Sequence, residues 1–363
     1  MQVVRKDKIS ETVSVYLDGL RIIAAALVYL SHEKRESLTG GFLRPLGSFG
    51  HEGVVIFFIV SGFVICHATT GRRDDFRGYC IARLARLWSV VLPALCLTVC
   101  LDLAGSRVAP QIYAVPGLPP MWSASWHSLW QFVAPALFVN KFGGISIDPG
   151  TNGPFWSLCY EFWYYVAWGV YVYFRSWWRY IVILCLALAA GPGIMSLAPI
   201  WILGAALATL LGRQMRPRGW TVAGLGVSIV AIAVALREKY VIESALTGLC
   251  GTFGPVVQDY MLAVIFAVNL WLVASIRGQS AMLLASCAGA IKFVAGRSFS
   301  LYLYQVPLLF FFGALTHDWR SFVPRALLVN GLTLACVLGF AEVTERKKSI
   351  VKRLLGRFVG VAS

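Results

Sequence analysis

The sequence predicts an all-α polytopic membrane protein, and three observations support this fold class. Of the 363 residues, 58% are hydrophobic and only 13% are charged, and the mean hydropathy is +0.71. Soluble domains carry roughly 25% charged residues, so this chain has too few to cover a soluble globule. Its 22 Phe, 14 Tyr and 13 Trp exclude a disordered chain. The apolar residues also form runs near the length of about 20 residues that a helix needs to cross a bilayer.

Ten apolar runs define the predicted membrane-spanning helices. They lie at 14–32, 53–69, 86–104, 154–174, 179–192, 197–212, 219–236, 258–276, 298–315 and 323–343. The fifth and sixth runs are short, and Gly191-Pro192-Gly193, a sequence that interrupts helices, lies between them. The Trp-rich segment 126–139 predicts a further helix at the membrane interface or a re-entrant piece.

The chain is predicted to form one membrane domain over residues 1–363, with its spans running roughly from 14 to 343. The loop 105–153 between the third and fourth spans is long enough to cover a site but too short to fold alone. A basic tail follows the last span at 344–363.

The net charge of +15 is explained by membrane topology. Lys and Arg gather in cytoplasmic loops, and an even number of spans places both termini on one side. With both termini in the cytoplasm, 22 Lys and Arg fall on the cytoplasmic side and 9 on the outer side, and Arg21 lies inside the first span. The basic excess therefore gives no reason to expect a nucleic-acid partner.

Metal and nucleotide-hydrolysis chemistry find no support in the sequence. The nine Cys are scattered through apolar segments without a CxxC pair, which favours small packing residues over a disulfide or zinc framework. His51, His67, His127 and His317 share no ligand spacing, and the sequence contains no P-loop, HExxH or GxSxG motif. We expect no metal site.

Three polar residues lie on one face of the first span. Asp18 and Arg21 are three residues apart and can pair on a helix. His32 follows Arg21 by eleven residues, close to three turns, so the two share a face about 16 Å apart. From the spacing alone, a local ion pair with an interfacial His is the favoured explanation, and a functional polar site within the membrane is the alternative.

The third span begins with an arginine pair. Arg83 and Arg86 are three residues apart at the predicted cytoplasmic surface, and Arg suits bidentate binding of phosphate. The alternative is an anchor that reaches lipid phosphates.

Glu161 lies within the aromatic fourth span, about 10 Å below its outer edge, and therefore in the outer half of the membrane with His32. A carboxylate there must be protonated, paired or facing a polar cavity, in a structural or a catalytic role. Ser61-Gly62 in the second span favours close helix packing. In the ninth span, Pro307 should kink the helix and free a carbonyl.

The order of these motifs is more informative than any one of them. The run LDGLR followed by His32 resembles the opening of the acyltransferase-3 family of integral membrane O-acyltransferases. Further similar motifs follow in the same order, from residue 17 to 307: GVVIFFIVSGF, RLAR, WSLCYEFWYY and SFSLYLYQVPL. The resemblance implies a ten-helix membrane fold that transfers an acyl group.

By this resemblance His32 is the catalytic histidine, Arg21 its companion and Glu161 the carboxylate of the fourth span. Arg83 and Arg86 are implied to bind the phosphates of acyl-CoA. Residues expected to support the site are Asp18, Ser61, Gly62, Trp156, Ser157, Tyr302 and Gln305.

Two positions depart from the family pattern. Val55 stands where an acidic residue is common, and Gln305 stands where a His is common. A mechanism that uses a carboxylate at 55 or an imidazole at 305 therefore cannot operate here. Glu52, three residues upstream of Val55, is a candidate replacement.

The resemblance implies transfer of an acyl group, by family frequency acetyl, from cytoplasmic acyl-CoA to a hydroxyl of an exported or lipid-linked carbohydrate. The acyl donor is a substrate, and no permanently bound cofactor is expected. Partners would be acyl-CoA, a carbohydrate or glycolipid acceptor and the lipid bilayer of a bacterial inner membrane. The acceptor, the modified hydroxyl, the size of the acyl group and the oligomeric state stay open.

A neutral imidazole can take the proton of the attacking sugar hydroxyl, and an acyl-histidine intermediate is the alternative. Glu161 would orient the imidazole or bind sugar hydroxyls, and the aromatic residues around 122–130 and 155–168 offer stacking surfaces or membrane anchors. Two other functions are a glycan or lipid-precursor transporter, which would consume no acyl-CoA, and a catalytically silent receptor or scaffold.

Overall fold

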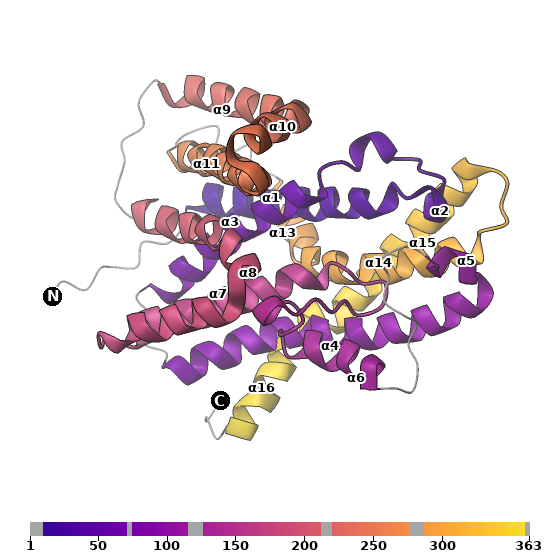
Figure 1. Ribbon diagram of the computed structural model, residues 1–363, viewed down its shortest axis with the longest axis horizontal. Helices are drawn as coiled ribbons and strands as arrows, with labels where there is room; N and C mark the ends of the chain where they lie inside the picture. The colour runs from indigo at the N-terminus through magenta and orange to yellow at the C-terminus, as the bar shows by residue number, and fades with distance from the viewer. Residues whose placement is uncertain (1–9, 71–74, 115–125, 212–219, 276–286, 360–363) are drawn as a thin grey trace. The chain divides into compact units, whose positions relative to one another are not determined.

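The computed structural model describes residues 10–70, 75–114, 126–211, 220–275 and 287–359, and within these ranges the chain is mainly helical, with no strand (Figure 1). The long helices are α1 (Glu11–Glu33), α3 (Gly50–Thr69), α4 (Phe76–Val108), α7 (Phe155–Tyr173), α8 (Trp178–Leu211), α9 (Trp220–Arg237), α11 (Gly254–Ala274), α14 (Ser298–Leu315) and α15 (Phe322–Val343). Shorter helices are α2 (Glu36–Thr39), α5 (Pro110–Tyr113), α6 (Trp126–Ala136), α10 (Lys239–Cys250), α13 (Ala288–Ala295) and α16 (Lys348–Val359). Single turns are η1 (Arg44–Leu46), η2 (Phe142–Gly144), η3 (Gly251–Phe253) and η4 (Glu345–Lys347).

The predicted fold class is confirmed. Within the described ranges, eight helical stretches are long and apolar enough to cross a membrane. They include α8 as one stretch of 34 residues, although it covers two predicted spans. The aromatic α7, which coincides with the predicted span 154–174, is not among the eight, because its Tyr, Trp and Glu residues lower its hydropathy. The chain is a polytopic all-α membrane protein.

Each predicted span coincides with a helix. The structure adds detail at two places, the break within α8 and the start of α4. The backbone of α8 leaves helical geometry at Gly191, with φ 86° and ψ 168°, so the helix is interrupted where Gly191-Pro192-Gly193 predicts a break. A positive φ of this kind favours glycine. By contrast, α4 begins at Phe76, ten residues before the predicted start, because the Asp75 side chain accepts a hydrogen bond from the Gly78 N–H at 2.8 Å and caps the helix.

Among the described residues, five helices were not predicted, namely the four-residue α2 and α5 and the longer α10, α13 and α16. The segment predicted as a basic tail contains η4 and the amphipathic α16, whose charged residues lower the hydropathy on which the span prediction relied. The predicted interfacial segment 126–139 contains α6. Several basic residues that count toward the predicted orientation, and the start of the aromatic run 122–130, lie outside the described residues; these basic residues are 5, 6, 8, 72, 73, 213, 216, 218 and 277.

The chain forms two compact units. The first comprises residues 1–24, 51–73 and 195–295. The second comprises residues 25–50, 74–194 and 296–363.

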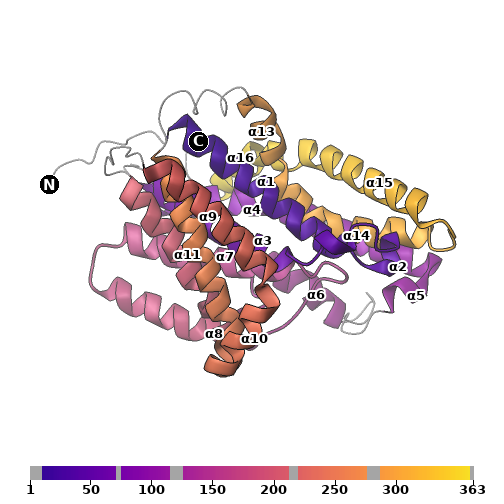
Figure 2. The ribbon, with the colours of Figure 1, turned by 90° about the horizontal axis from the view of Figure 1, so that it is seen from above.

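In the first unit, helices approach each other at small residues. A Cβ atom on Gly62 of α3 would lie 2.0 Å from the carbonyl oxygen of Trp201 in α8, so only glycine fits. This is the close packing that the Ser61-Gly62 pair predicts, and the Trp201 indole also donates to the Ser61 hydroxyl at 3.3 Å. Helices α9, α10 and α11 pack together, and Figure 2 shows α9 and α11 side by side.

The second unit is centred on α14, which packs against α4 and α15 (Figure 1). Pro307 lies inside α14 and has no N–H to donate to the carbonyl of Leu303, four residues earlier. The Asn152 side chain donates to this carbonyl at 2.8 Å. The predicted free carbonyl is confirmed, and a residue 151 positions away in sequence binds it.

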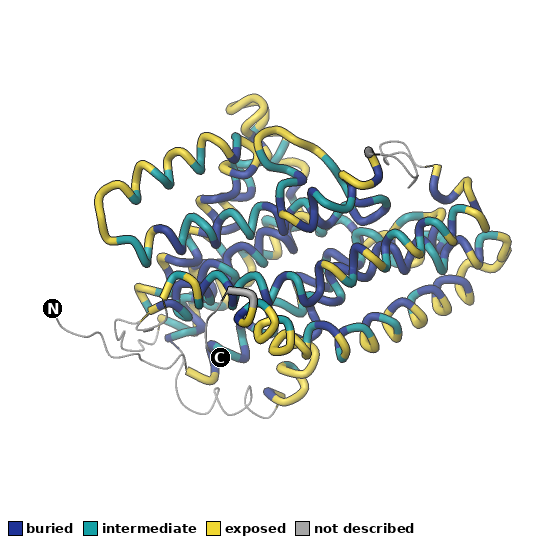
Figure 3. The backbone as a smooth tube through the Cα atoms, turned by 90° about the horizontal axis from the view of Figure 1, so that it is seen from below, coloured by how far each residue is buried: buried dark blue, intermediate teal, exposed yellow. Residues whose placement is uncertain are grey.

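Figure 3 shows exposed residues, in yellow, along several of the helices, and many of the exposed residues on the long helices are large and apolar. On α9, Val222 and Val227 are 76% and 70% exposed. On α15, Leu327 and Leu338 are 61% and 48% exposed. A soluble monomer rarely carries apolar surface of this extent, whereas a lipid-facing helix requires it.

Candidate active site

His32 is the penultimate residue of α1 and belongs to the second unit. Its side chain is half-buried, and within the described part of the chain the imidazole has no hydrogen-bond partner. No hydrogen bond joins His32 to Glu161, so the predicted orienting role of Glu161 gains no direct support among the described residues.

The residues that follow His32 hold the end of α1 in place. Glu33 is fully buried, and its carboxylate accepts hydrogen bonds from the Leu43 N–H at 3.2 Å and the Asn330 side-chain amide at 3.1 Å. Asn330 lies on α15 and also accepts from the Tyr29 hydroxyl, one turn before His32. The end of α1 that carries His32 is therefore held in place by hydrogen bonds of neighbouring residues. The His32 ring itself makes no hydrogen bond within the described chain.

The short segment after α1 is fastened to α14 and α15. Arg325 of α15 donates to the carbonyls of Ser37 at 2.7 Å and Gly313 at 3.2 Å. The Arg35 guanidinium lies 5.3 Å from the centre of the Phe310 ring, a cation–π contact, and burial lowers the pKa of this guanidinium from its ordinary value. These contacts make the surroundings of His32 rigid.

Arg21 and Asp18 form the predicted ion pair, with Nη1 and Oδ1 3.1 Å apart. Both residues belong to the first unit. They share the uninterrupted helix α1 with His32, so the predicted spacing of three turns along one helix is present.

Arg83 and Arg86 lie seven and ten residues after the start of α4, roughly 10 and 15 Å along the helix. They are half-buried, and Arg86 is deeper in the helix than the predicted cytoplasmic surface, because α4 begins ten residues earlier than expected. Arg86 interacts electrostatically with the carboxylates of Glu161 and Glu345. The structure thus groups Arg86 with Glu161, which the sequence prediction placed in the opposite half of the membrane.

A tyrosine, Tyr165, belongs to the same group of side chains. We define the arginine cluster as Arg83, Arg86, Glu161, Tyr165 and Glu345. The Tyr165 hydroxyl donates to the Glu161 carboxylate, and Arg83 and Arg86 both interact electrostatically with Tyr165. The sequence analysis missed Glu345, whose carboxylate is held by the Ser300 N–H at 3.0 Å and the Ser300 hydroxyl at 2.8 Å. Glu345 is a single Glu in an otherwise basic run, and this is the sequence feature from which it could have been identified.

The predicted supporting residues of α7 and α14 form a second hydrogen-bonded group. The Ser157 and Tyr302 hydroxyls are 2.6 Å apart, and the Tyr302 hydroxyl also donates to the Pro154 carbonyl at 3.1 Å. Gln305 is fully buried; its amide donates to the Tyr302 carbonyl at 3.3 Å, and its Oε1 has no partner among the described residues. Trp156 lies edge-on to Tyr160.

In the described part of the chain, no group of three or more His, Cys, Asp or Glu side chains is arranged to hold a metal ion. What the site offers is an imidazole that accepts or donates no hydrogen bond within the described residues, and a separate cluster of arginines and carboxylates. These groups suit proton transfer and anion binding respectively.

Long apolar helices with histidine, arginine and carboxylate side chains among them define a polytopic membrane protein with a polar interior. A family model described as an acyltransferase domain matches residues 14–342, and the chain therefore belongs to this acyltransferase family. The family predicted from the sequence motifs is confirmed.

Two relatives illustrate the similarity. The "O-acetyl transferase" of Shigella phage Sf6 is 25% identical over 237 residues, which are 59% of this chain and 66% of the phage protein. The "Putative O-acetyltransferase SACOL0978" of Staphylococcus aureus (strain COL) is 31% identical over 160 residues, which are 41% of this chain and 23% of that protein. The chain thus matches less than two thirds of the length of either relative. No solved structure matches it.

Proposed function

We propose that this protein is a membrane O-acyltransferase that moves an acyl group from acyl-CoA to a hydroxyl of a carbohydrate. The observation that carries the proposal is the match of the acyltransferase family to residues 14–342, nearly the whole chain. The names of both relatives favour acetyl as the acyl group. In the predicted orientation, acyl-CoA enters from the cytoplasm and the acceptor is an exported or lipid-linked carbohydrate in a bacterial inner membrane.

His32 is the proposed general base. Its imidazole takes the proton of the acceptor hydroxyl while the hydroxyl oxygen attacks the thioester carbonyl carbon. The carbon–sulfur bond then breaks, and the proton passes from the imidazolium to the departing thiolate, leaving an O-acyl ester and free CoA. The absence of a protein hydrogen bond to the imidazole in the described chain supports this role, because neither ring nitrogen is engaged by another described residue.

Arg83 and Arg86 are the proposed binding residues for the CoA phosphates, to which guanidinium groups donate charge-assisted hydrogen bonds. Their partners differ: Arg86 is balanced by the carboxylates of Glu161 and Glu345, whereas Arg83 interacts with the phenolic groups of Tyr79 and Tyr165. Arg86 keeps Glu161 in place, and Arg21 is the companion of His32 on α1.

The proposal is tested by following radiolabel from acetyl-CoA into cell-envelope glycan in membranes that contain the protein. We expect His32→Ala to lower labelling at least 100-fold, within the range usual for loss of a general base, with unchanged abundance in the membrane. His127→Ala is the matched control, because His127 is exposed on α6 and should leave labelling intact.

Labelling that persists in His32→Ala would remove His32 from the mechanism. Transport of a glycan precursor without any consumption of acetyl-CoA would contradict acyl transfer and establish a transporter instead.

A further inference from the structure

The first unit contains a cavity of about 280 Å³ that the acyl-transfer mechanism does not use. Its walls come from the beginning of α3, the end of α9, and the facing sides of α10 and α11. The volume lies just below the usual range of small-molecule sites, roughly 300–1,000 Å³. The cavity therefore suits a ligand of about one ring.

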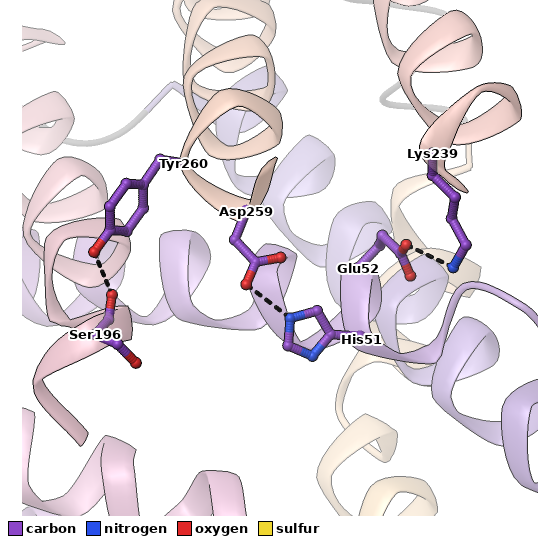
Figure 4. Close-up of polar contacts among 6 residues, drawn as sticks. All are labelled: His51, Glu52, Ser196, Lys239, Asp259 and Tyr260. Carbon is purple, nitrogen blue, oxygen red and sulfur yellow. Dashed lines mark hydrogen bonds and ion pairs between the residues drawn. The ribbon is translucent and has the colours of Figure 1, made fainter. Parts of the chain in front are cut away.

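Two charged pairs line this cavity. The His51 Nε2 atom lies 2.8 Å from the Asp259 carboxylate, and the Lys239 ammonium lies 2.9 Å from the Glu52 Oε1 atom. Figure 4 shows the two pairs next to each other, with the side chains of α10 and α11 directed toward those of α3. Glu52, Lys239 and Asp259 are each more than nine-tenths buried. Buried charges in a membrane protein are costly, and such residues usually serve a function.

The second carboxylate oxygen of Glu52 has no hydrogen-bond partner in the described chain, although it is fully buried. An ionised carboxylate can accept about four hydrogen bonds. Within the described chain, the Glu52 carboxylate accepts one, from the Lys239 ammonium to Oε1. A buried acceptor without a donor is unfavourable. Among the described residues, Glu52 is therefore a cavity-lining carboxylate whose capacity to accept hydrogen bonds is not filled.

The chemistry of the walls favours a neutral, hydroxylated ligand. The carboxylates of Glu52, Glu243 and Asp259 disfavour an anion. A metal ion is disfavoured because, among the described residues, no three ligand side chains are placed to hold one. The apolar side chains of Leu236 and Leu262 complete the lining, and such surface suits the C–H groups of a sugar ring while hydroxyls reach the polar residues.

We propose that this cavity binds one neutral sugar ring of the acceptor carbohydrate, with Glu52 Oε2 accepting a hydrogen bond from a sugar hydroxyl. The inference rests on the proposed function, which requires a carbohydrate acceptor. In the predicted topology α3 and α11 begin, and α9 ends, at the outer membrane surface, where an exported carbohydrate is present. Glu52 thus has a role of its own, separate from replacing the acidic residue absent at position 55.

The test measures binding of glucose, galactose, mannose and N-acetylglucosamine to the full chain by saturation-transfer NMR. The protein is placed in phosphatidylcholine nanodiscs, because sugar-headed detergents would compete. We expect at least one sugar to bind, and Glu52→Gln to weaken that binding at least tenfold. Glu238→Gln is the matched control, since Glu238 pairs with Arg237 outside the cavity and should bind as the parent protein does.

A second variant guards against misfolding of Glu52→Gln. Ala235→Phe fills the cavity while leaving both charged pairs intact, and it should abolish sugar binding in a protein of unchanged elution volume and melting temperature. Absence of sugar binding to the parent protein, or equal binding by both cavity variants, would overturn the proposal.

The binding assay contains no acyl-CoA, so its outcome is separate from that of acyl transfer. Acetyl labelling of glycan together with Glu52-independent sugar binding would overturn the cavity assignment and leave the proposed function standing. Glu52-dependent sugar binding without labelling under any acyl-CoA would contradict the proposed function and support the cavity as a sugar site.

Discussion

The end of α1 and the arginine cluster both lie in the second unit, yet their polar side chains differ in the protein partners that surround them. The His32 imidazole makes no hydrogen bond within the described chain, while the backbone and side chains around it are fixed by Glu33, Asn330 and Arg325. In the arginine cluster, Arg86 has carboxylates and a phenol around it. The proposed general base is thus left without a hydrogen bond from the described residues, whereas a permanent charge inside a membrane is balanced by the protein.

The largest effect on stability is expected at Arg86. Arg86→Met leaves the carboxylates of Glu161 and Glu345 without this nearby cation, and a charge inside a membrane protein that loses its counter-charge is costly. We expect a strongly lowered melting temperature in nanodiscs, followed by tryptophan fluorescence. Arg83→Met is the matched comparison and should lose less, because Arg83 lies three residues nearer the start of α4.

A double variant separates charge balance from packing. Glu345→Gln removes one of the two carboxylates, so Arg86→Met combined with Glu345→Gln should be more stable than Arg86→Met alone. Additive losses in the double variant would show that Arg86 does not balance Glu345, and the contrast with His32 would then no longer hold.

The next effect concerns the donor substrate. Arg83→Ala should raise the KM for acetyl-CoA about tenfold, which corresponds to about 1.4 kcal/mol, a usual size for one charge-assisted hydrogen bond. The kcat should change much less, because His32 is untouched. The measurement is the initial rate of labelling against acetyl-CoA concentration, and Arg83→Lys should recover part of the affinity. An unchanged KM would return Arg83 to a topological anchor.

The sequence predicted those features that depend on local pattern. Apolar runs located the membrane helices, Gly191-Pro192-Gly193 located the break in α8, and the spacing of Asp18 and Arg21 predicted their ion pair. Each depends on residues that are neighbours along one helix, so the helical repeat is sufficient.

Features that depend on long-range contacts or on averaged hydropathy were not predictable. Glu345 joins the arginine cluster because η4 places it beside Ser300, 45 residues earlier. The start of α4 depends on the cap at Asp75, a polar residue outside any apolar run. The cavity of the first unit needs α3, α10 and α11 together, and the 12-residue α10 is too short to stand out as a membrane span.

The smallest effect tests how the second unit tolerates a proline in its central helix. Asn152→Leu removes the amide that donates to the Leu303 carbonyl and to the Thr98 hydroxyl, leaving a buried carbonyl without a donor. We expect a loss of about 1–3 kcal/mol, visible as a lower melting temperature.

The matched background is Pro307→Ala, which restores the backbone N–H four residues after Leu303. In that background the helix itself supplies the hydrogen bond, so Asn152→Leu should cost less than it does in the parent chain. Equal costs in the two backgrounds would show that Asn152 acts through Thr98 and not through the carbonyl freed by the proline. A reduced cost would establish that a loop residue completes the hydrogen bonding of α14, the helix around which the second unit is built.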